Sequence, residues 1–265
     1  EYMCSADLRE FIEENHLDLS MNGCLNPRDT FGTHDDADHV YNTPRAWFIG
    51  RYFNPKTAVW DGPDADYTPL SDDIPWCMVP EKKVTVEDIK YVLSSHYQGT
   101  PYDPYGSYGD PSWRGAYRSI GVNRTDFVAI LQLRADRPEE YRAVEWLAFG
   151  SNAFNTAVPF YANVEKTPEY LANTTKEVTT ENFYGKNLNH IEHYQQAVQS
   201  KGHELIAKYD RLQAAEEDAA KRAALREAAN EEIAAMLRKE TGKTLDEVLY
   251  DATNHMKNQY ARSDH

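Results

Sequence analysis

Residues 41–47 put a cation at a position where an anion could bind. Thr43 and Pro44 are typical of a helix start, Thr43 as the capping residue and Pro44 at the first helical position. Arg45 follows them directly. Backbone N–H groups at the start of a helix favour anions, and a guanidinium can hold a carboxylate through two parallel hydrogen bonds. Arg45 is therefore a candidate anion-binding residue, with an ordinary surface arginine as the alternative.

Two other segments contain side chains that could do chemistry. His96 lies at the end of an expected helix, where the helix dipole favours the imidazolium form, although a structural histidine is the alternative. Residues 34–39 combine two histidines with three aspartates, which could bind a metal ion. Metal sites usually draw their ligands from separate elements, so we expect a solvated acidic loop and neither a metal nor a cofactor.

The three cysteines do not form a recognisable site. Cys4, Cys24 and Cys77 are too few for a disulfide scaffold and too widely spaced for a zinc site. We expect ordinary thiols, with a single Cys4–Cys24 bridge conceivable. As a nucleophile, Cys4 would need a base and an oxyanion site, which its sequence neighbours do not supply. Glycine-rich nucleotide loops and the common zinc-peptidase and serine-hydrolase motifs are also missing from the sequence.

Composition excludes several classes of protein. The 265 residues include 43 acidic and 28 basic side chains, a net charge of −15. This balance argues against partners such as nucleic acid or an anionic membrane surface. The best apolar run, residues 127–133, is too short to span a membrane, and 12% aromatic residues argue against a disordered acidic chain. A chain of this length forms one large domain or two small ones.

Helices are expected to position the candidate residues. Ser5 can cap a first helix, and Thr43 begins a second one that carries an aromatic face. Thr85 and Asp88 have the spacing of a capping box, which predicts a third helix ending near His96.

Strands follow in the middle of the chain. Alternating apolar residues predict strands at 127–133 and 144–149, with a third at 158–164. The first two are apolar on both faces, as in a layered sandwich, yet so few strands cannot form one alone. The remaining strands are either missed by the pattern or contributed by another chain. Beyond residue 182 the pattern predicts a helical hairpin and then a final helix capped by Thr244.

Six segments of the sequence form a recognisable set of motifs. They are Tyr41-Asn42-Thr43-Pro44-Arg45-Ala46-Trp47, the thirteen residues from Leu93 to Tyr105, Ile120-Gly121-Val122-Asn123-Arg124-Thr125, Trp146-Leu147-Ala148-Phe149-Gly150, Val158-Pro159-Phe160-Tyr161 and Asn182-Phe183-Tyr184. In this order the motifs resemble the bacterial dipeptidase A family of cysteine peptidases in the N-terminal-nucleophile hydrolase superfamily. The resemblance extends over roughly residues 1–260.

The resemblance implies an α+β fold, as part of an αββα N-terminal-nucleophile hydrolase sandwich with a long helical C-terminal region. We expect residues 1–180 to form the C-terminal part of that hydrolase domain, with long loops. Residues 181–265 should form a helical region packed on it. The implied activity is hydrolysis of small peptides, without a cofactor.

Family members are nearly twice as long as this chain. The nucleophile of such enzymes is a cysteine at the mature amino terminus, whose own α-amino group is the base, and it would precede Glu1. The resemblance therefore implies that this chain is the C-terminal part of a dipeptidase, inactive alone. Its partner would be the N-terminal part or chain that carries the cysteine.

By analogy with related penicillin and bile-salt amidases, Arg45 is the expected catalytic residue. Asn42, His96 and Arg124 lie in the family motifs and are the expected substrate-binding residues. The alternative is a non-catalytic binding or scaffold subunit that assembles through its helical tail, and a homo-oligomer is possible. The compartment stays open between the cytoplasm, which we favour, and secretion.

Overall fold

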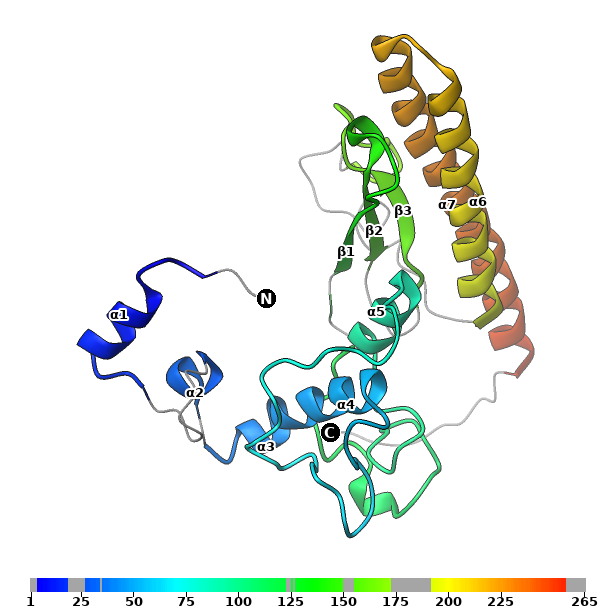
Figure 1. Ribbon diagram of the computed structural model, residues 1–265. Coiled ribbons are helices and arrows are strands. Elements are labelled where there is room, and N and C mark those ends of the chain that lie inside the picture. The colour runs from blue at the N-terminus through cyan, green and yellow to red at the C-terminus, as the bar shows by residue number, and fades with distance from the viewer. Residues whose placement is uncertain are drawn as a thin grey trace. The chain divides into compact units, whose positions relative to one another are not determined.

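The computed structural model describes residues 4–18, 27–33, 35–122, 125, 127–149, 155–172 and 192–255 (Figure 1). They fall into two compact units. The first comprises Glu1–Val84 with His96–Ile120, and the second comprises Thr85–Ser95 with Gly121–His265. Helices and an antiparallel sheet occur together, which confirms the α+β class.

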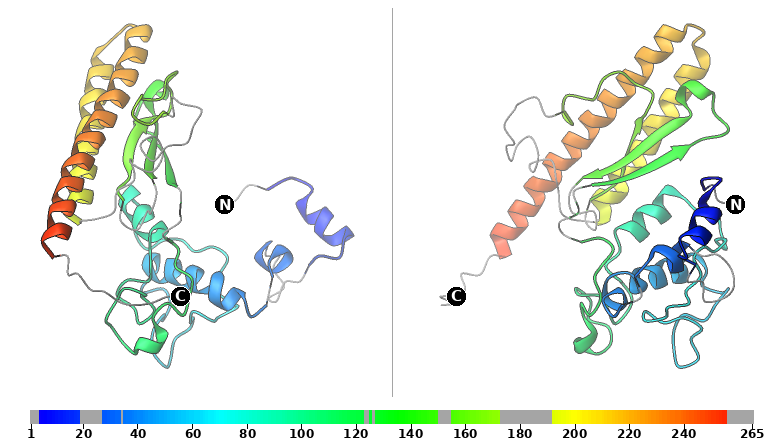
Figure 2. Two further views of the ribbon diagram at one scale, coloured as in Figure 1. Left: turned by 180° about the vertical axis from the view of Figure 1, so that it is seen from behind. Right: turned by 90° about the vertical axis from the view of Figure 1, so that its left-hand side faces the viewer.

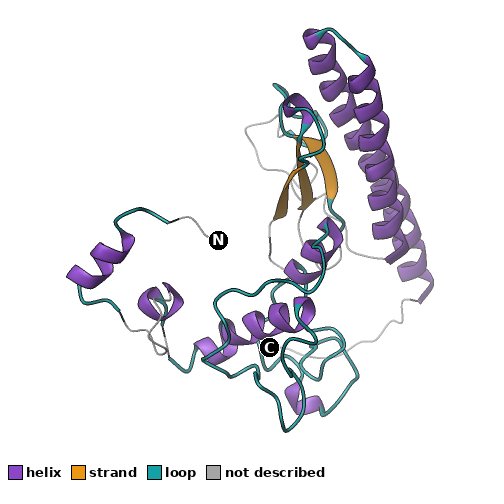
Figure 3. Cartoon of the chain, viewed as in Figure 1, coloured by secondary structure: helices purple, strands orange, loops and turns teal. Residues whose placement is uncertain are grey.

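In its described residues, the first unit consists of helices and loops (Figure 3). Its core is aromatic, because loops offer few regular apolar stripes and large rings fill the irregular space between them. The buried side chains of this core are Trp47, Phe48, Trp60, Ile74, Tyr97 and Tyr117. Its helices are α1 (Leu8–Glu14), α2 (Pro27–Phe31), α3 (Asp38–Tyr41) and α4 (Thr43–Phe53), with a 3₁₀ turn at Pro111–Trp113.

The starts of α1 and α4 differ from the prediction. Asn42, not Thr43, is the residue before α4, and its carbonyl oxygen accepts from the backbone N–H groups of Arg45 and Ala46, both at 3.1 Å. Because α3 leads almost directly into α4, Asn42 is itself helical and makes no side-chain cap. Asp7, not Ser5, is likewise the residue that precedes α1.

The second unit contains a three-stranded antiparallel sheet in the order β1-β2-β3. The strands are β1 (Phe127–Leu133), β2 (Ala143–Phe149) and β3 (Val158–Tyr161). All three strands are confirmed, although β3 ends before the expected Val164. The hairpin loop between β1 and β2 contains a 3₁₀ turn at Glu139–Tyr141.

Helix α5 (Val86–Leu93) confirms the predicted capping box. Thr85 Oγ1 accepts from Asp88 N at 3.1 Å, and Thr85 N donates to Asp88 Oδ2 at 2.9 Å. The reciprocal bonds satisfy two N–H groups that a helix start would otherwise leave without partners. The helix then ends at Leu93, before His96.

Helices α6 (Glu192–Ala215) and α7 (Ala219–His255) form the predicted hairpin and lie along the sheet (Figure 2). Asn230 of α7 accepts from Tyr161 N at 2.8 Å and donates to Tyr161 O at 3.0 Å, so the helix satisfies the backbone groups of the last residue of β3. The expected final helix from Thr244 is wrong, because α7 continues through that residue. Thr244 Oγ1 instead donates to Glu240 O at 2.9 Å, within the helix.

The helices cover one face of the sheet and leave part of the other face open. The buried face carries Ile130 and Trp146, whereas Phe127, Leu131 and Leu133 of β1 are 60%, 78% and 77% exposed. Burial of both faces, expected for the first two strands, is therefore not found in β1, whereas all four residues of β3 are buried.

The helical hairpin shares a core with the sheet in the second unit. The predicted boundary between residues 180 and 181 lies outside the described residues, so that division stays a prediction. Among the helices of the described part, none combines the length and apolar character needed to cross a membrane.

Candidate active site

Helix α4 fixes the position of Arg45. Trp47 and Phe48 lie on the inner side of the helix and are each 2% exposed. The indole Nε1 of Trp47 donates to the carbonyl oxygen of Trp60 at 3.1 Å, which anchors the helix to the following loop. Arg45, two residues before Trp47, is turned by about 200° around the axis and is half-buried at the edge of the core.

Two motif segments meet at one carbonyl oxygen. Arg45 Nε donates to Arg118 O at 3.3 Å, and the hydroxyl of Tyr97 donates to the same oxygen at 2.7 Å. Tyr97 is fully buried and packs edge-on against Phe48, with ring centroids 5.7 Å apart. The residues around Arg45 and those around Tyr97, more than fifty positions apart in the chain, therefore share one anchoring point.

Arg45 is a constrained cation. Only its Nε is engaged by a hydrogen bond within the described residues, so the two terminal nitrogens remain available. By contrast, Arg51 of the same helix is paired with Asp61, Nε to Oδ2 at 2.8 Å. Burial lowers the pKa of Arg45; the nearby hydroxyl of Tyr97 opposes this shift, and the charge of Arg118 adds to it. A guanidinium stays protonated at neutral pH, so Arg45 presents a fixed positive charge.

Tyr97 is held as a hydrogen-bond donor. Burial raises its pKa, an effect that the positive charge of Arg45 only partly offsets. Its backbone has a positive φ of 65°, which a non-glycine residue rarely adopts and which often occurs at functional sites. Gly99, with φ +77°, then completes the turn without steric cost.

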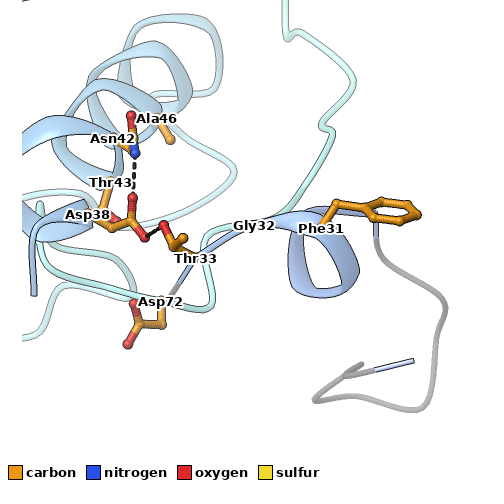
Figure 4. Close-up of a pocket in the computed structure, with 8 residues that line it drawn as sticks. All are labelled: Phe31, Gly32, Thr33, Asp38, Asn42, Thr43, Ala46 and Asp72. Atoms are coloured by element: carbon orange, nitrogen blue, oxygen red, sulfur yellow. Dashed lines mark hydrogen bonds between the residues drawn. The ribbon is translucent and has the colours of Figure 1, made fainter. Parts of the chain in front are cut away.

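Asn42 lies beside a pocket of about 430 Å³ in the first unit (Figure 4). Its Nδ2 donates to Asp38 Oδ1, and Thr33 Oγ1 donates to the other oxygen of Asp38 at 2.6 Å. The complete lining is Phe31, Gly32, Thr33, Asp38, Asn42, Thr43, Ala46 and Asp72. Arg45 is not part of this lining, so the pocket does not bring Asn42 and Arg45 together.

His96 is oriented by a carboxylate. Its Nδ1 lies 2.8 Å from Asp103 Oδ1, and both side chains are largely buried. Tyr105 packs edge-on against the imidazole at 5.2 Å, while its backbone N–H donates to the same carboxylate oxygen at 2.9 Å. The Asp103 contact fixes the ring and leaves Nε2 without a hydrogen-bond partner among the described residues.

The described residues of the acidic run at 34–39 form hydrogen bonds and an ion pair with other protein groups. Asp35 accepts from the backbone of Ala37 at 3.0 Å, and His39 pairs with Asp72 at 3.0 Å. No cluster of three or more His, Cys, Asp or Glu side chains suited to a metal occurs in the described part of the chain, to which His34 does not belong.

Two predicted residues fall outside the described ranges. Arg124, the third expected substrate-binding residue, is one of them, and Cys24 is the other. Cys4 and Cys77 are exposed free thiols.

The sequence did not reveal Arg118 and Asp103 as parts of the site. Asp103 follows His96 by seven residues within one motif, and that proximity is a usable signal. Arg118 lies in an irregular loop, where neither a periodic pattern nor a capping residue indicates that its carbonyl oxygen anchors Arg45.

Comparison with known proteins identifies the class of protein. The profile of Peptidase family C69 matches residues 1–210, which is most of the chain, and the chain belongs to that family.

Curated relatives agree with this assignment. A dipeptidase of Bifidobacterium longum is 48% identical over 99% of this chain and 59% of its own length. A probable dipeptidase A of Streptococcus pyogenes is 40% identical over 100% of this chain and 56% of its own length. The dipeptidase A of Lactobacillus helveticus is 43% identical over 66% of this chain and 35% of its own length. The chain thus spans a little over half the length of the first two relatives.

Proposed function

We propose that the protein containing this chain is a cysteine-type dipeptidase, with Arg45 as a residue of its active site. The observation that carries the proposal is the half-buried guanidinium of Arg45, fixed through Nε to the Arg118 carbonyl with its terminal nitrogens available. Membership of a peptidase family and the names of the relatives support the reaction class.

The nucleophile is supplied by residues outside this chain. Neither Cys4 nor Cys77 has a hydrogen bond to a base within the described residues, and both are exposed. The family resemblance supports an N-terminal cysteine whose own α-amino group takes the thiol proton. Thiolate attack on the peptide carbonyl would form an acyl-enzyme and release the protonated amine, and water would then hydrolyse the thioester. Oxyanion donors would stabilise both tetrahedral intermediates.

The open face of β1 is the proposed contact for the rest of the enzyme. Phe127, Leu131 and Leu133 form an apolar row on a strand whose other face is already packed against helices. A second sheet stacked about 10 Å away would bury this row and complete an αββα sandwich. This partner, the N-terminal part of the protein, would bring the cysteine and the missing strands.

The proposal is tested with the complete protein and with residues 1–265 alone. We expect the complete protein to hydrolyse dipeptides and the isolated chain to show no turnover. Arg45→Ala in the complete protein should lower kcat/KM by roughly tenfold to hundredfold, because a charged hydrogen bond to substrate is lost. Arg51→Ala, which removes an arginine of the same helix that is paired with Asp61, is the matched control. Robust turnover by the isolated chain would refute the external nucleophile, and unchanged kinetics of Arg45→Ala would remove that residue from the site.

A non-catalytic scaffold subunit is the second candidate. Leu245 and Tyr250, on the last turns of α7, are exposed and could serve an assembly surface. This function predicts that the complete protein lacks turnover while it forms an oligomer that depends on these two side chains.

A further inference from the structure

Arg118 combines a fixed backbone with a guanidinium that forms no ion pair within the described residues. Its N–H donates to Val40 O at 3.0 Å, and its carbonyl accepts from Arg45 and Tyr97. These bonds hold its loop against the α3–α4 corner. The guanidinium is half-buried and stacks over the ring of Tyr41, with Cζ 5.6 Å from the centroid.

Neither Arg118 nor Arg45 pairs with a carboxylate in the described part of the chain, although the sequence contains 43 acidic residues. The two side chains lie at the same corner: Arg45 Nε donates to Arg118 O, and the Arg118 guanidinium stacks on Tyr41, four residues before Arg45. Burial is the first cause of the lowered pKa of Arg45, and the charge of Arg118 contributes in the same direction. Two neighbouring, partly desolvated cations repel each other, and this cost is removed when an anion binds between them. The ring of Tyr41 offsets only part of it through a cation–π contact.

We propose that Arg118 is a second carboxylate-binding residue, which together with Arg45 holds the terminal carboxylate of a dipeptide. A carboxylate has about four lone-pair sites and can accept from two guanidinium groups at once. Tyr97 fixes the Arg118 peptide from the buried side, so that the backbone that carries Arg118 is already held in place when the substrate arrives. This inference rests on the proposed dipeptidase function and adds a substrate requirement to it: a free carboxylate on the residue after the cleaved bond.

The test compares a dipeptide with the same dipeptide carboxamide, which lacks the negative charge. In the complete protein, Arg118→Gln should raise KM for the dipeptide by roughly tenfold to hundredfold with little change in kcat. The preference for the dipeptide over its carboxamide should fall by the same factor. Arg118→Lys, which keeps the charge but not the planar fork, should restore part of the preference. Arg114→Gln removes an exposed arginine of the same loop and should change nothing.

The possible outcomes distinguish failure of the proposed function from failure of the inference about Arg118. Absence of turnover by the wild-type protein overturns the proposed function and this inference with it. If the wild-type protein prefers the dipeptide and Arg118→Gln keeps the same preference, the inference alone is wrong. An equal loss on both substrates would also refute it, because it would indicate a structural role. If Arg118→Gln fails to fold, Arg118→Lys decides: an unreduced preference overturns the inference, and a reduced one with the wild-type unfolding temperature supports it.

Discussion

Removal of the Asp210 side chain of α6 should strongly destabilise the second unit. Its carboxylate accepts from Arg134 at 2.6 and 3.1 Å, from Arg137 Nε at 3.0 Å and from the Tyr161 hydroxyl at 2.8 Å. The Asp210 and Arg134 side chains are only 8% and 13% exposed. Asp210→Ala would leave the Arg134 cation buried without a counterion, which costs about 3–5 kcal/mol.

Thermal and urea unfolding of the purified protein measure this effect. A loss of this size should lower the unfolding temperature by roughly 6–20 °C. The matched control is Asp136→Ala, which removes a carboxylate that is 71% exposed and pairs with Arg137. A surface pair of this kind contributes about 0–1 kcal/mol, so the control should unfold almost like the wild type. If the two variants lost equal stability, burial of the Asp210 network could not be the cause.

Two further perturbations test the packing and the charge of the second unit. A Cβ at Gly121 would lie 2.5 Å from the Ser94 carbonyl oxygen, so Gly121→Ala should lower the free energy of unfolding by about 1–3 kcal/mol. Gly242 lies in α7 with open space around its Cα, so Gly242→Ala should raise the free energy of unfolding by about 1 kcal/mol. Urea midpoints of the two variants that do not move in opposite directions would contradict this. Burial lowers the pKa of Lys90 to about 8, whereas a lysine in an unfolded chain has a pKa of about 10.4. Between these pH values the unfolded state therefore binds more protons than the folded state, and the stability of the wild type rises with pH. Lys90→Met should therefore be the more stable protein below pH 8, by an advantage that disappears towards pH 10.4; a constant difference in unfolding temperature across this range would show that the charge of Lys90 is not penalised.

Local sequence patterns were sufficient to predict several elements. The strands β1 and β2 follow from alternation of apolar residues, and α5 follows from the reciprocal bonds of Thr85 and Asp88. The same logic failed at Thr43 and Thr244, because each resembles a cap while its neighbours continue the helix. At Thr244 the hydroxyl bonds back to Glu240, an alternative that the sequence pattern does not distinguish from a cap.

The site was only partly predictable, because its residues are joined through a backbone atom. Arg45 could be found from a helix start, but its anchor is the carbonyl oxygen of Arg118, and any residue type would provide one. Tyr97 belongs to a recognised motif, yet its contact with that carbonyl depends on a left-handed backbone conformation. Such long-range convergence has no signature in spacing or composition.

Strand β1 has a practical consequence for anyone who produces this chain. It is one of the two edge strands of the sheet, so its far backbone edge pairs with no strand in the described part, and Leu131 and Leu133 lie on this strand. An open edge next to apolar side chains is a template for strand-to-strand aggregation. Dilute, cold handling of residues 1–265 would slow this association.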